Sequence, residues 1–300
     1  MAMNLITLFD TFNTDEQCRD YLERLRWPHG PTCSKCGTIG EASRIKNRAT
    51  WHCRACGHHF SVTAGTIMHD SHLPLRKWFA AIFLMVESRK GMSANQLKRT
   101  LGVGYKTAWY LCHRIREAMG NDPVEGPALL GIVEVDETLV GGKAKGKGRH
   151  YLGNKTWVAG AIQRDGQLRV ERIPDVKRTT LHDFIRRSVK DEAEAIYTDE
   201  LKSYLGIEDH NTRHETVNHS QDIWVVGDVH TNSIEGVWSL FKRSIIGAFH
   251  KMSAKHMDRY LEELEWRFNN RDNPHIFRDT MARIVHTDPM TFRQLVDEAA

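Results

Sequence analysis

Three acidic residues that lie far apart in the sequence, Asp136, Asp199 and Glu235, could together perform phosphodiester chemistry. Clustered carboxylates repel one another, and the repulsion raises the pKa of at least one of them unless cations compensate. Hard divalent ions such as Mg²⁺ or Mn²⁺ prefer carboxylate oxygens as ligands. Two such ions about 4 Å apart can activate a water or a 3′-hydroxyl and stabilise the leaving oxygen of an in-line displacement. The three residues are therefore candidate ligands of two catalytic Mg²⁺ or Mn²⁺ ions.

Asp136 and Asp199 each belong to a predicted strand. Asp136 lies within the apolar stretch 132–140, and Asp199 ends the short apolar stretch 195–199. Glu134 shares a strand face with Asp136, because side chains alternate along a strand, so it competes as a metal ligand. Taken singly, Asp136 could be an edge or turn residue, and Asp199 could cap a following helix.

Glu235 lies near the start of a helix predicted at 230–246. Asn232-x-x-Glu235 also resembles a capping box, in which the glutamate only satisfies the helix start. From spacing alone both interpretations stay open. Asn232, Glu235, Ser239 and Lys242 form one polar stripe on this helix, so Lys242 could bind a phosphate beside a metal-bound Glu235.

Four of the six cysteines form two C-x2-C pairs that are separated by sixteen residues. This is the spacing of a zinc ribbon that holds one structural Zn²⁺. The four candidate ligands are Cys33, Cys36, Cys53 and Cys56. Gly37 and Gly57 supply the positive φ that such tight turns need. The alternatives are four ordinary buried thiols, or a replacement ligand from one of the neighbouring histidines, His52, His58 and His59. Cys18 and Cys112 lack this spacing and are expected in the core.

Residues 72–120 predict a helical segment that contains a helix-turn-helix. Ser93 is a plausible N-cap for a first helix, Gly102 to Gly104 form the turn, and a second helix follows. Five basic residues would meet DNA phosphates: Lys98, Arg99, Lys106, Arg114 and Arg116. The alternative is a helical hairpin with a solvated basic face.

A glycine-rich basic stretch follows the first candidate strand. Its cations are Lys143, Lys145, Lys147 and Arg149. Flexible backbone lets such residues approach phosphates closely, although a solvated loop is the alternative. Lys242 and Arg243 extend the positive charge beyond Glu235. The whole chain has 42 lysines and arginines against 38 acids, a net charge of +4, which permits a nucleic-acid partner without requiring one.

The elements around the acidic residues alternate between strands and helices. Three strands are predicted at 132–140, 156–164 and 167–173, followed by a helix at 180–189 and the strand at 195–199. This order predicts an α/β fold and is compatible with an RNase H-like domain, as well as with other α/β folds. The predicted organisation is a zinc ribbon with an N-terminal helix at 1–70, the helical segment at 72–120, the catalytic domain at 128–275 and a helical tail at 276–300.

No secretory signal and no apolar run long enough to span a bilayer occur in the sequence. We therefore expect a cytoplasmic, nucleoid-associated protein whose cysteines stay reduced, which favours metal ligation over disulfides.

The chain resembles DDE-type insertion-sequence transposases of the ISXO-like group. The resemblance covers roughly residues 15 to 275 and is carried by the order and spacing of several short stretches. These are Cys53–Gly57, Phe60–Thr66, Leu73–Trp78, Val133–Glu137, Gly141–Lys143, Tyr197–Asp199 and His230–Gly236.

This resemblance implies a zinc ribbon, a helix-turn-helix-like segment and an RNase H-like catalytic domain. It makes Asp136, Asp199 and Glu235 the metal ligands, with Lys242 seven residues further on, and it favours that role of Glu235 over the capping box. Asn232 stays a reserve candidate, because some relatives have asparagine as the third member. The resemblance also implies binding of terminal inverted repeats, strand cleavage, strand transfer into target DNA, and a homo-oligomer on double-stranded DNA. The alternatives are a catalytically inactive DNA-binding regulator and a nuclease that does not transpose.

Overall fold

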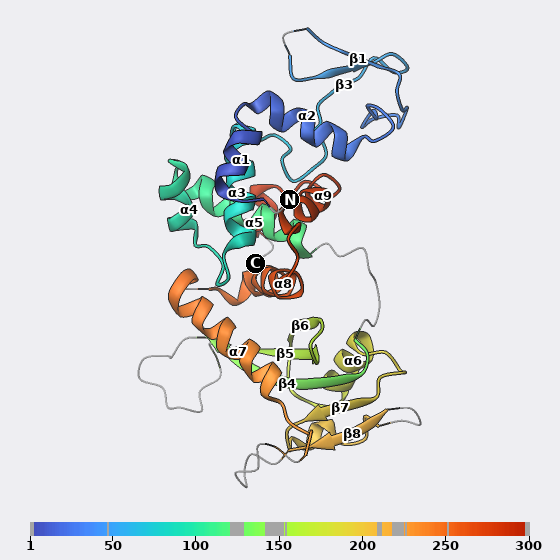
Figure 1. The fold of residues 1–300 in the computed structure, drawn as a ribbon, viewed down its shortest axis with the longest axis vertical. Coiled ribbons are helices and arrows are strands. Elements are labelled where there is room, and N and C mark those ends of the chain that lie inside the picture. Colours follow the sequence, from blue (N-terminus) through green and yellow to red (C-terminus); the bar gives the residue numbers. More distant parts are fainter. Residues whose placement is uncertain are drawn as a thin grey trace. The chain divides into compact units, whose positions relative to one another are not determined.

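The computed structural model describes residues 3–46, 48–120, 129–141, 153, 155–208, 212–217, 225, 227–250 and 252–297 (Figure 1). The chain forms two compact units. The first contains residues 1–121 and 272–300, and the second contains residues 122–271.

The N-terminal part of the first unit joins two helices to a small sheet. Helix α1 (Leu5–Thr11) is followed by α2 (Asp15–Arg26), which starts at a capping box between Thr14 and Gln17. Cys18 is buried on α2, as expected of a core residue. The antiparallel sheet has the order β1 (Ala42–Arg44), β2 (Trp51–Cys53) and β3 (His59–Phe60). Trp27 packs edge-on against Trp51 and Phe60, which fixes the sheet to the end of α2.

The rest of the first unit is helical. Helix α3 (Leu75–Glu87) is almost wholly buried, and α4 (Ala94–Leu101) and α5 (Tyr105–Gly120) form the expected helix-turn-helix pair. The Ser93 side chain accepts a hydrogen bond from the Gln96 amide and so caps α4, and Gly102 ends this helix with a φ of 59°. Both residues do what the sequence predicted.

The C-terminal helices α9 (Ile276–Ile284) and α10 (Phe292–Asp297) belong to this unit. Phe277 packs against Phe79 and Phe83 of α3, and Arg283 donates a hydrogen bond to the Met119 carbonyl at the end of α5. Residues 276–284 thus complete the core of the N-terminal unit.

The second unit is built on a five-stranded sheet with the order β6-β5-β4-β7-β8. Strands β4 (Ile132–Gly141), β5 (Lys155–Gln163) and β6 (Leu168–Ile173) form an antiparallel meander. Strand β7 (Ala195–Thr198) runs parallel to β4, and β8 (Arg213–Thr216) runs parallel to β7. Only Ile132 to Glu134 of β4 pair with β7, so the rest of β4 extends beyond the end of its neighbour.

Helices cover both faces of this sheet (Figure 1). Helix α6 (Arg178–Ser188) packs on the face that carries Val133 and Val135. Helix α7 (Asn232–Ser244), which continues into a π-helical turn at Ile245–Phe249, and helix α8 (Met257–Asn269) pack on the face that carries Val140 and Val158. Because side chains alternate along β4, Asp136 points to the α7 face and Glu137 to the α6 face.

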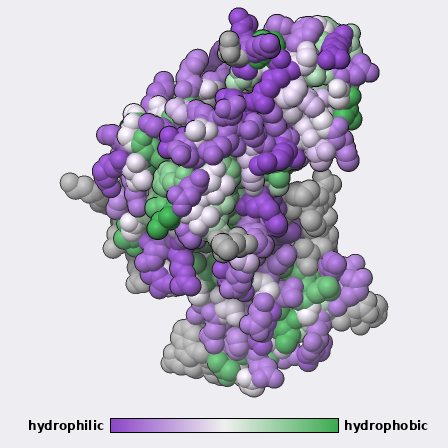
Figure 2. Space-filling model, turned by 45° about the horizontal axis from the view of Figure 1, so that its top comes forward, coloured by the Kyte–Doolittle hydropathy of each residue, from purple (hydrophilic) through white to green (hydrophobic). Residues whose placement is uncertain are grey.

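Within the described ranges, none of the helices is long and apolar enough to cross a membrane. The face of the molecule drawn in Figure 2 is mainly hydrophilic, and its apolar residues occur in separate patches.

Candidate metal centre

The carboxylates of Asp136, Glu137 and Asp199 meet at one edge of the sheet in the second unit. Each offers an oxygen within 4.8 Å of the other two. Strands β4 and β7 are parallel neighbours, and Asp199 directly follows the last residue of β7. Since β4 continues past that point, its next residues lie beside the end of β7. The topology thereby joins residues that are more than sixty positions apart.

Burial and mutual repulsion act on these carboxylates. Burial is the main cause that raises the pKa of Asp136 to about 7. The charges of Asp199 and Glu235 act in the same direction, and a hydrogen bond from Trp238 acts against them. Burial is likewise the main cause that raises the pKa of Glu137 to about 7. The hydrogen bond from Tyr204 opposes this shift, and the charges of Asp136 and Asp199 favour it. A divalent cation between these groups would relieve the repulsion, so the donor set fits Mg²⁺ or Mn²⁺.

Each carboxylate is oriented by a neighbouring group. The Trp238 indole N–H donates to Asp136 Oδ2 over 2.9 Å, and the buried Tyr204 hydroxyl donates to Glu137 Oε2 over 2.5 Å. The Leu201 amide donates to Asp199 Oδ1 over 2.9 Å, so Asp199 also holds the turn after β7. This turn leads into a short 3₁₀ helix at Lys202–Tyr204.

Glu235 lies in the first turn of α7, half-buried, and its charge contributes to the raised pKa of Asp136. It is not one of the three residues whose oxygens lie within 4.8 Å of one another. The capping box that includes Asn232 does not form. Asn232 is an exposed residue inside the helix, and the N-cap is Thr231, whose side chain makes no capping bond.

Glu134 is not free to act as the competing ligand that its strand face suggested. It is fully buried, and both of its carboxylate oxygens accept hydrogen bonds from groups around the start of α7. Sequence reasoning missed Glu137 instead, because strict alternation assigns it to the opposite face from Asp136. The early end of β7 lets both side chains reach the same edge.

The four cysteines of the first unit also converge. Cys33 and Cys56 have sulfur atoms 3.7 Å apart, and those of Cys36 and Cys53 are 3.6 Å apart. A tetrahedral ion with Zn–S bonds of about 2.3 Å needs sulfur atoms about 3.8 Å apart, so the cluster fits Zn²⁺. A hydrogen bond from the Thr38 side chain lowers the pKa of Cys36 to about 6, which favours the thiolate that binds metal.

The two cysteine turns have matching backbones. Gly37 donates to the Cys33 carbonyl and Gly57 donates to the Cys53 carbonyl, each over 2.9 Å. Both glycines have positive φ, 74° and 71°, as the sequence predicted. No histidine joins the sulfur cluster within the described part of the chain, so the four-cysteine set is the one that the structure supports.

Family models match both regions of the chain that contain these two clusters. Residues 128–269 match the ISXO2-like transposase domain, and residues 13–59 match the transposase zinc-ribbon domain. The uncharacterized protein in transposable element ISH50 of Halobacterium salinarum is 31% identical over 255 residues, which cover 78% of this chain and 84% of that protein. The chain belongs to the ISXO2-like transposase family.

Other similarities cover less or are weaker. An uncharacterized transposase-like protein of Haemophilus influenzae is 34% identical over 98 residues, which cover 33% of this chain and 77% of that protein. The Mos1 strand transfer complex is 12% identical over 74% of this chain and 78% of that chain, with a TM-score of 0.30. The five-stranded sheet with helices on both faces confirms the predicted α/β fold class, and the family match confirms a transposase domain preceded by a zinc ribbon.

The basic residues predicted for this transposase family member fall into three groups. Lys98, Arg99 and Lys106 are exposed on α4 and at the start of α5, and Lys242 and Arg243 are exposed in the last turn of α7. A third group lies outside the described residues, namely Lys143, Lys145, Lys147 and Arg149.

Arg114 and Arg116, which were predicted to meet phosphates, are buried in the structure. Arg114 is 4% exposed, and Arg116 is 2% exposed. The Arg114 guanidinium donates to the His69 carbonyl over 2.6 Å and lies over the rings of Trp78 and Tyr110. Burial lowers its pKa. Helix α5 is enclosed over most of its length, so only its first turn presents residues to a partner.

Proposed function

We propose that the protein is an active DDE transposase that binds the terminal inverted repeats of an insertion sequence, cleaves them and joins them to target DNA. The observation that carries the proposal is the meeting of Asp136, Glu137 and Asp199 within 4.8 Å, with the charge of Glu235 acting on the same group. Membership in a transposase family supports the substrate class.

In this proposal Asp136, Asp199 and Glu235 hold two Mg²⁺ or Mn²⁺ ions. Bound there, the ions would lower the pKa of an attacking water or 3′-hydroxyl and stabilise the leaving oxygen. The protein contributes the geometry. Trp238 donates to Oδ2 of Asp136 and the Leu201 amide donates to Oδ1 of Asp199, so a neighbouring group orients each carboxylate.

DNA contact would involve the exposed cations. Lys242 lies two turns from Glu235 on the same helix and would bind a phosphate near the reacting bond. Lys98, Arg99 and Lys106 would hold the duplex against α4 and the first turn of α5, with the glycine-rich basic stretch and Arg243 adding further contacts. The ribbon would hold one structural Zn²⁺ through its four cysteines. A homo-oligomer on paired DNA ends, acting at the nucleoid, completes the proposal.

A strand-transfer assay with DNA that carries the element's ends tests the proposal. Asp136→Asn should abolish both cleavage and joining, while binding of the end DNA stays at the wild-type level. Asp183→Asn, at an exposed position on α6 in the same unit, is the matched control and should leave both steps intact.

Two outcomes would replace the proposal with another function. A wild-type protein that binds the DNA ends but never cuts them with Mg²⁺ or Mn²⁺ would be a DNA-binding regulator. Cutting without joining would indicate a nuclease.

A further inference from the structure

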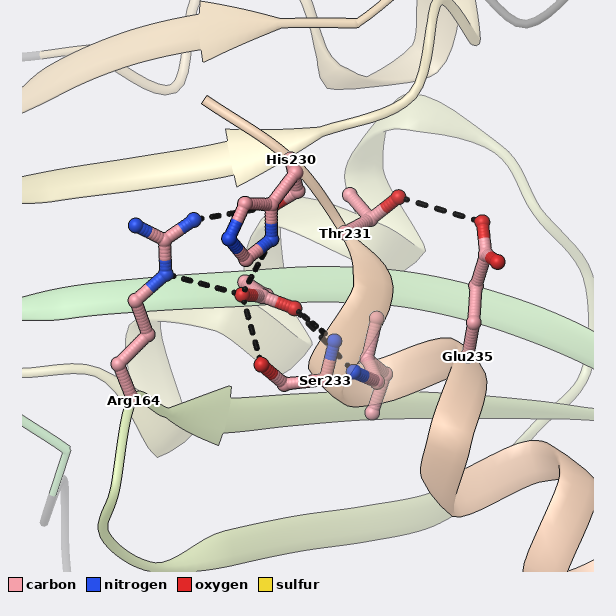
Figure 3. A network of polar contacts seen from close by, with 7 residues as sticks. Arg164, His230, Thr231, Ser233 and Glu235 are labelled. Carbon is pink, nitrogen blue, oxygen red and sulfur yellow. Dashed lines mark hydrogen bonds and ion pairs between the residues drawn. The ribbon is translucent and has the colours of Figure 1, made fainter. Parts of the chain in front are cut away.

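Glu134 lies at the centre of a network of polar contacts beside the proposed metal centre, and both of its carboxylate oxygens accept hydrogen bonds within this network. Its Oε2 accepts hydrogen bonds from the backbone amides of Ser233 and Ile234, over 2.8 and 3.2 Å. Its Oε1 accepts from the Ser233 hydroxyl over 2.9 Å and from Arg164 Nε over 3.0 Å. Figure 3 shows these groups converging on one carboxylate, with His230 Nδ1 also 3.2 Å from Oε1.

Within this network, Glu134 caps the N-terminus of α7. The first amides of a helix have no partner within it, and a side chain of the N-cap residue usually satisfies one of them. In α7 the N-cap Thr231 makes no such bond. The carboxylate that replaces it comes from β4, about a hundred residues earlier. Its negative charge at the positive end of the helix dipole gives charge-assisted bonds, which are stronger than neutral ones.

The network also fixes the segment that enters α7. Arg164, which pairs with Glu134, donates to the His230 carbonyl over 3.3 Å and lies over the ring of Tyr197 on β7. One charge pair, between the buried Glu134 and the half-buried Arg164, therefore links β4, β7, the end of β5 and the first turn of α7.

A second contact holds α7 one turn further on. Asp136 pairs in register with Gly160 of β5, and the Trp238 side chain lies over this glycine. A Cβ atom at Gly160 would lie 2.6 Å from Trp238 Cη2 and 2.9 Å from Ile234 Cδ1. The close approach allows the Trp238 indole to reach Asp136. Glu235 lies in the sequence between the two contacts, at Ser233–Ile234 and at Trp238.

We propose that Glu134 is a positioning residue: by capping α7 from the neighbouring strand, it holds Glu235 toward Asp136 and Asp199. Glu134 and Asp136 lie two residues apart on one strand face, and Glu235 belongs to the same first helical turn as Ser233 and Ile234. Because Glu134 holds this turn against β4, it limits where the Glu235 side chain can lie. This inference rests on the proposed metal-binding function.

The test measures Mn²⁺ binding to the full chain by calorimetry, without DNA, in a set of single and double variants. Glu134→Gln keeps the shape of the side chain but removes its charge and one acceptor, since the amide nitrogen would face donors. We expect Mn²⁺ affinity to fall about 10- to 100-fold, as for other groups that orient metal ligands. Hydrogen exchange at the Ser233 and Ile234 amides should become faster in the metal-free protein.

A double variant separates positioning from a general structural role. If Glu134 acts through Glu235, then Glu134→Gln combined with Glu235→Gln should bind Mn²⁺ no more weakly than Glu235→Gln alone. Two losses that add would contradict the inference. Glu171→Gln is the matched control, because it removes an exposed carboxylate of the same sheet that pairs with Arg187, and it should bind Mn²⁺ like the wild type.

Glu134→Asp keeps the test valid if the glutamine variant does not fold. It retains the charge on a shorter arm, so affinity should lie between those of the wild type and Glu235→Gln, and wild-type affinity would overturn the inference. The proposed function fails in a different way. In that case Asp136→Asn would bind Mn²⁺ as well as the wild type does, whatever Glu134 contributes.

Discussion

The two clusters of candidate metal ligands in this protein are assembled in opposite ways. In the ribbon, each cysteine pair is a turn of a few residues whose backbone bonds, Gly37 to Cys33 and Gly57 to Cys53, form locally. The carboxylate cluster joins Asp136 and Glu137 of β4 to Asp199, which follows β7, and Glu235 on α7 acts on Asp136 through its charge. A local site can be recognised from spacing, whereas a dispersed site depends on sheet topology and helix docking.

The largest effect is expected on the folding of the ribbon, when one of its cysteine ligands is removed. Cys56→Ser should remove the single zinc per chain and unfold the ribbon, because metal binding supplies folding free energy in such small modules. Metal analysis and hydrogen exchange should show loss of zinc and of protection in β1–β3, with the sheet of the second unit still protected. Cys18→Ser, at the buried cysteine outside the cluster, is the control that should keep its zinc. A ribbon that stays folded without metal would contradict the local-site interpretation.

A smaller effect, on stability and on Mn²⁺ affinity, is expected when the packing between β5 and α7 is disturbed. Gly160→Ala would place a Cβ 2.6 Å from the Trp238 ring, and relief of the clash must shift this side chain of α7 away from Asp136. Overpacking of this kind costs about 1–3 kcal/mol, which urea denaturation can measure. Mn²⁺ affinity should fall with it. Gly236→Ala, on the open side of α7 where a Cβ meets nothing within 4 Å, should leave Mn²⁺ affinity unchanged.

These two regions differ in how much the sequence could predict. The cysteine ligands follow from spacing, and the three strands β4 to β6 follow from apolar runs and a turn signal. The joint role of Asp136 and Asp199 was implied by the family resemblance. The role of Glu134 does not follow from the sequence, because a buried glutamate that caps a helix a hundred residues away has the same local pattern as a ligand. Strand β8 was not predicted, since Arg-His-Glu-Thr has no apolar alternation and lies at a sheet edge.

Arg114 illustrates the same limit. Its position in a basic helix-turn-helix predicted a phosphate contact, yet α5 is enclosed by other helices of the unit. Helical periodicity identifies an apolar stripe, but it cannot show that the polar side is covered too. Only the packing of distant segments decides which charges reach the surface.

A moderate effect is expected on the pH dependence of metal binding. With no divalent ion added, Asp136 and Glu137 have pKa values of about 7, above their ordinary values of 3.8 and 4.5. Each group thus binds protons more tightly in the folded state, so its contribution to stability is complete below about pH 4 and is lost as pH rises through 7. Binding of Mg²⁺ must displace these protons. Calorimetry in buffers of different ionisation enthalpy should show proton release at pH 6.5 and much less at pH 8.5.

The corresponding control is Asp136→Asn, which removes one of the two protons and should flatten the fall in stability between pH 4 and 7. Equal proton release at both pH values would show that the carboxylates are already ionised.

The smallest effect is expected at the exposed cations of the first unit. Lys98→Ala should weaken binding of end DNA only a few-fold and reduce the slope of log affinity against log salt by about 1. Arg114→Ala should leave that slope unchanged and lower the melting temperature instead, because it removes a buried guanidinium from between two rings. A reduced salt slope for Arg114→Ala would mean that α5 opens to expose it.

The return of α9 to the first unit has a consequence for biosynthesis. All of residues 122–271 are inserted between α5 and the helix that completes its core. During translation the ribbon and the catalytic unit can fold as soon as they emerge, but the apolar surface of α3 that receives Phe277 stays uncovered until α9 has been made. The helical unit that carries the helix-turn-helix thus matures after the catalytic unit has been synthesised, and a chain terminated before α9 would have a catalytic unit without a finished helical unit.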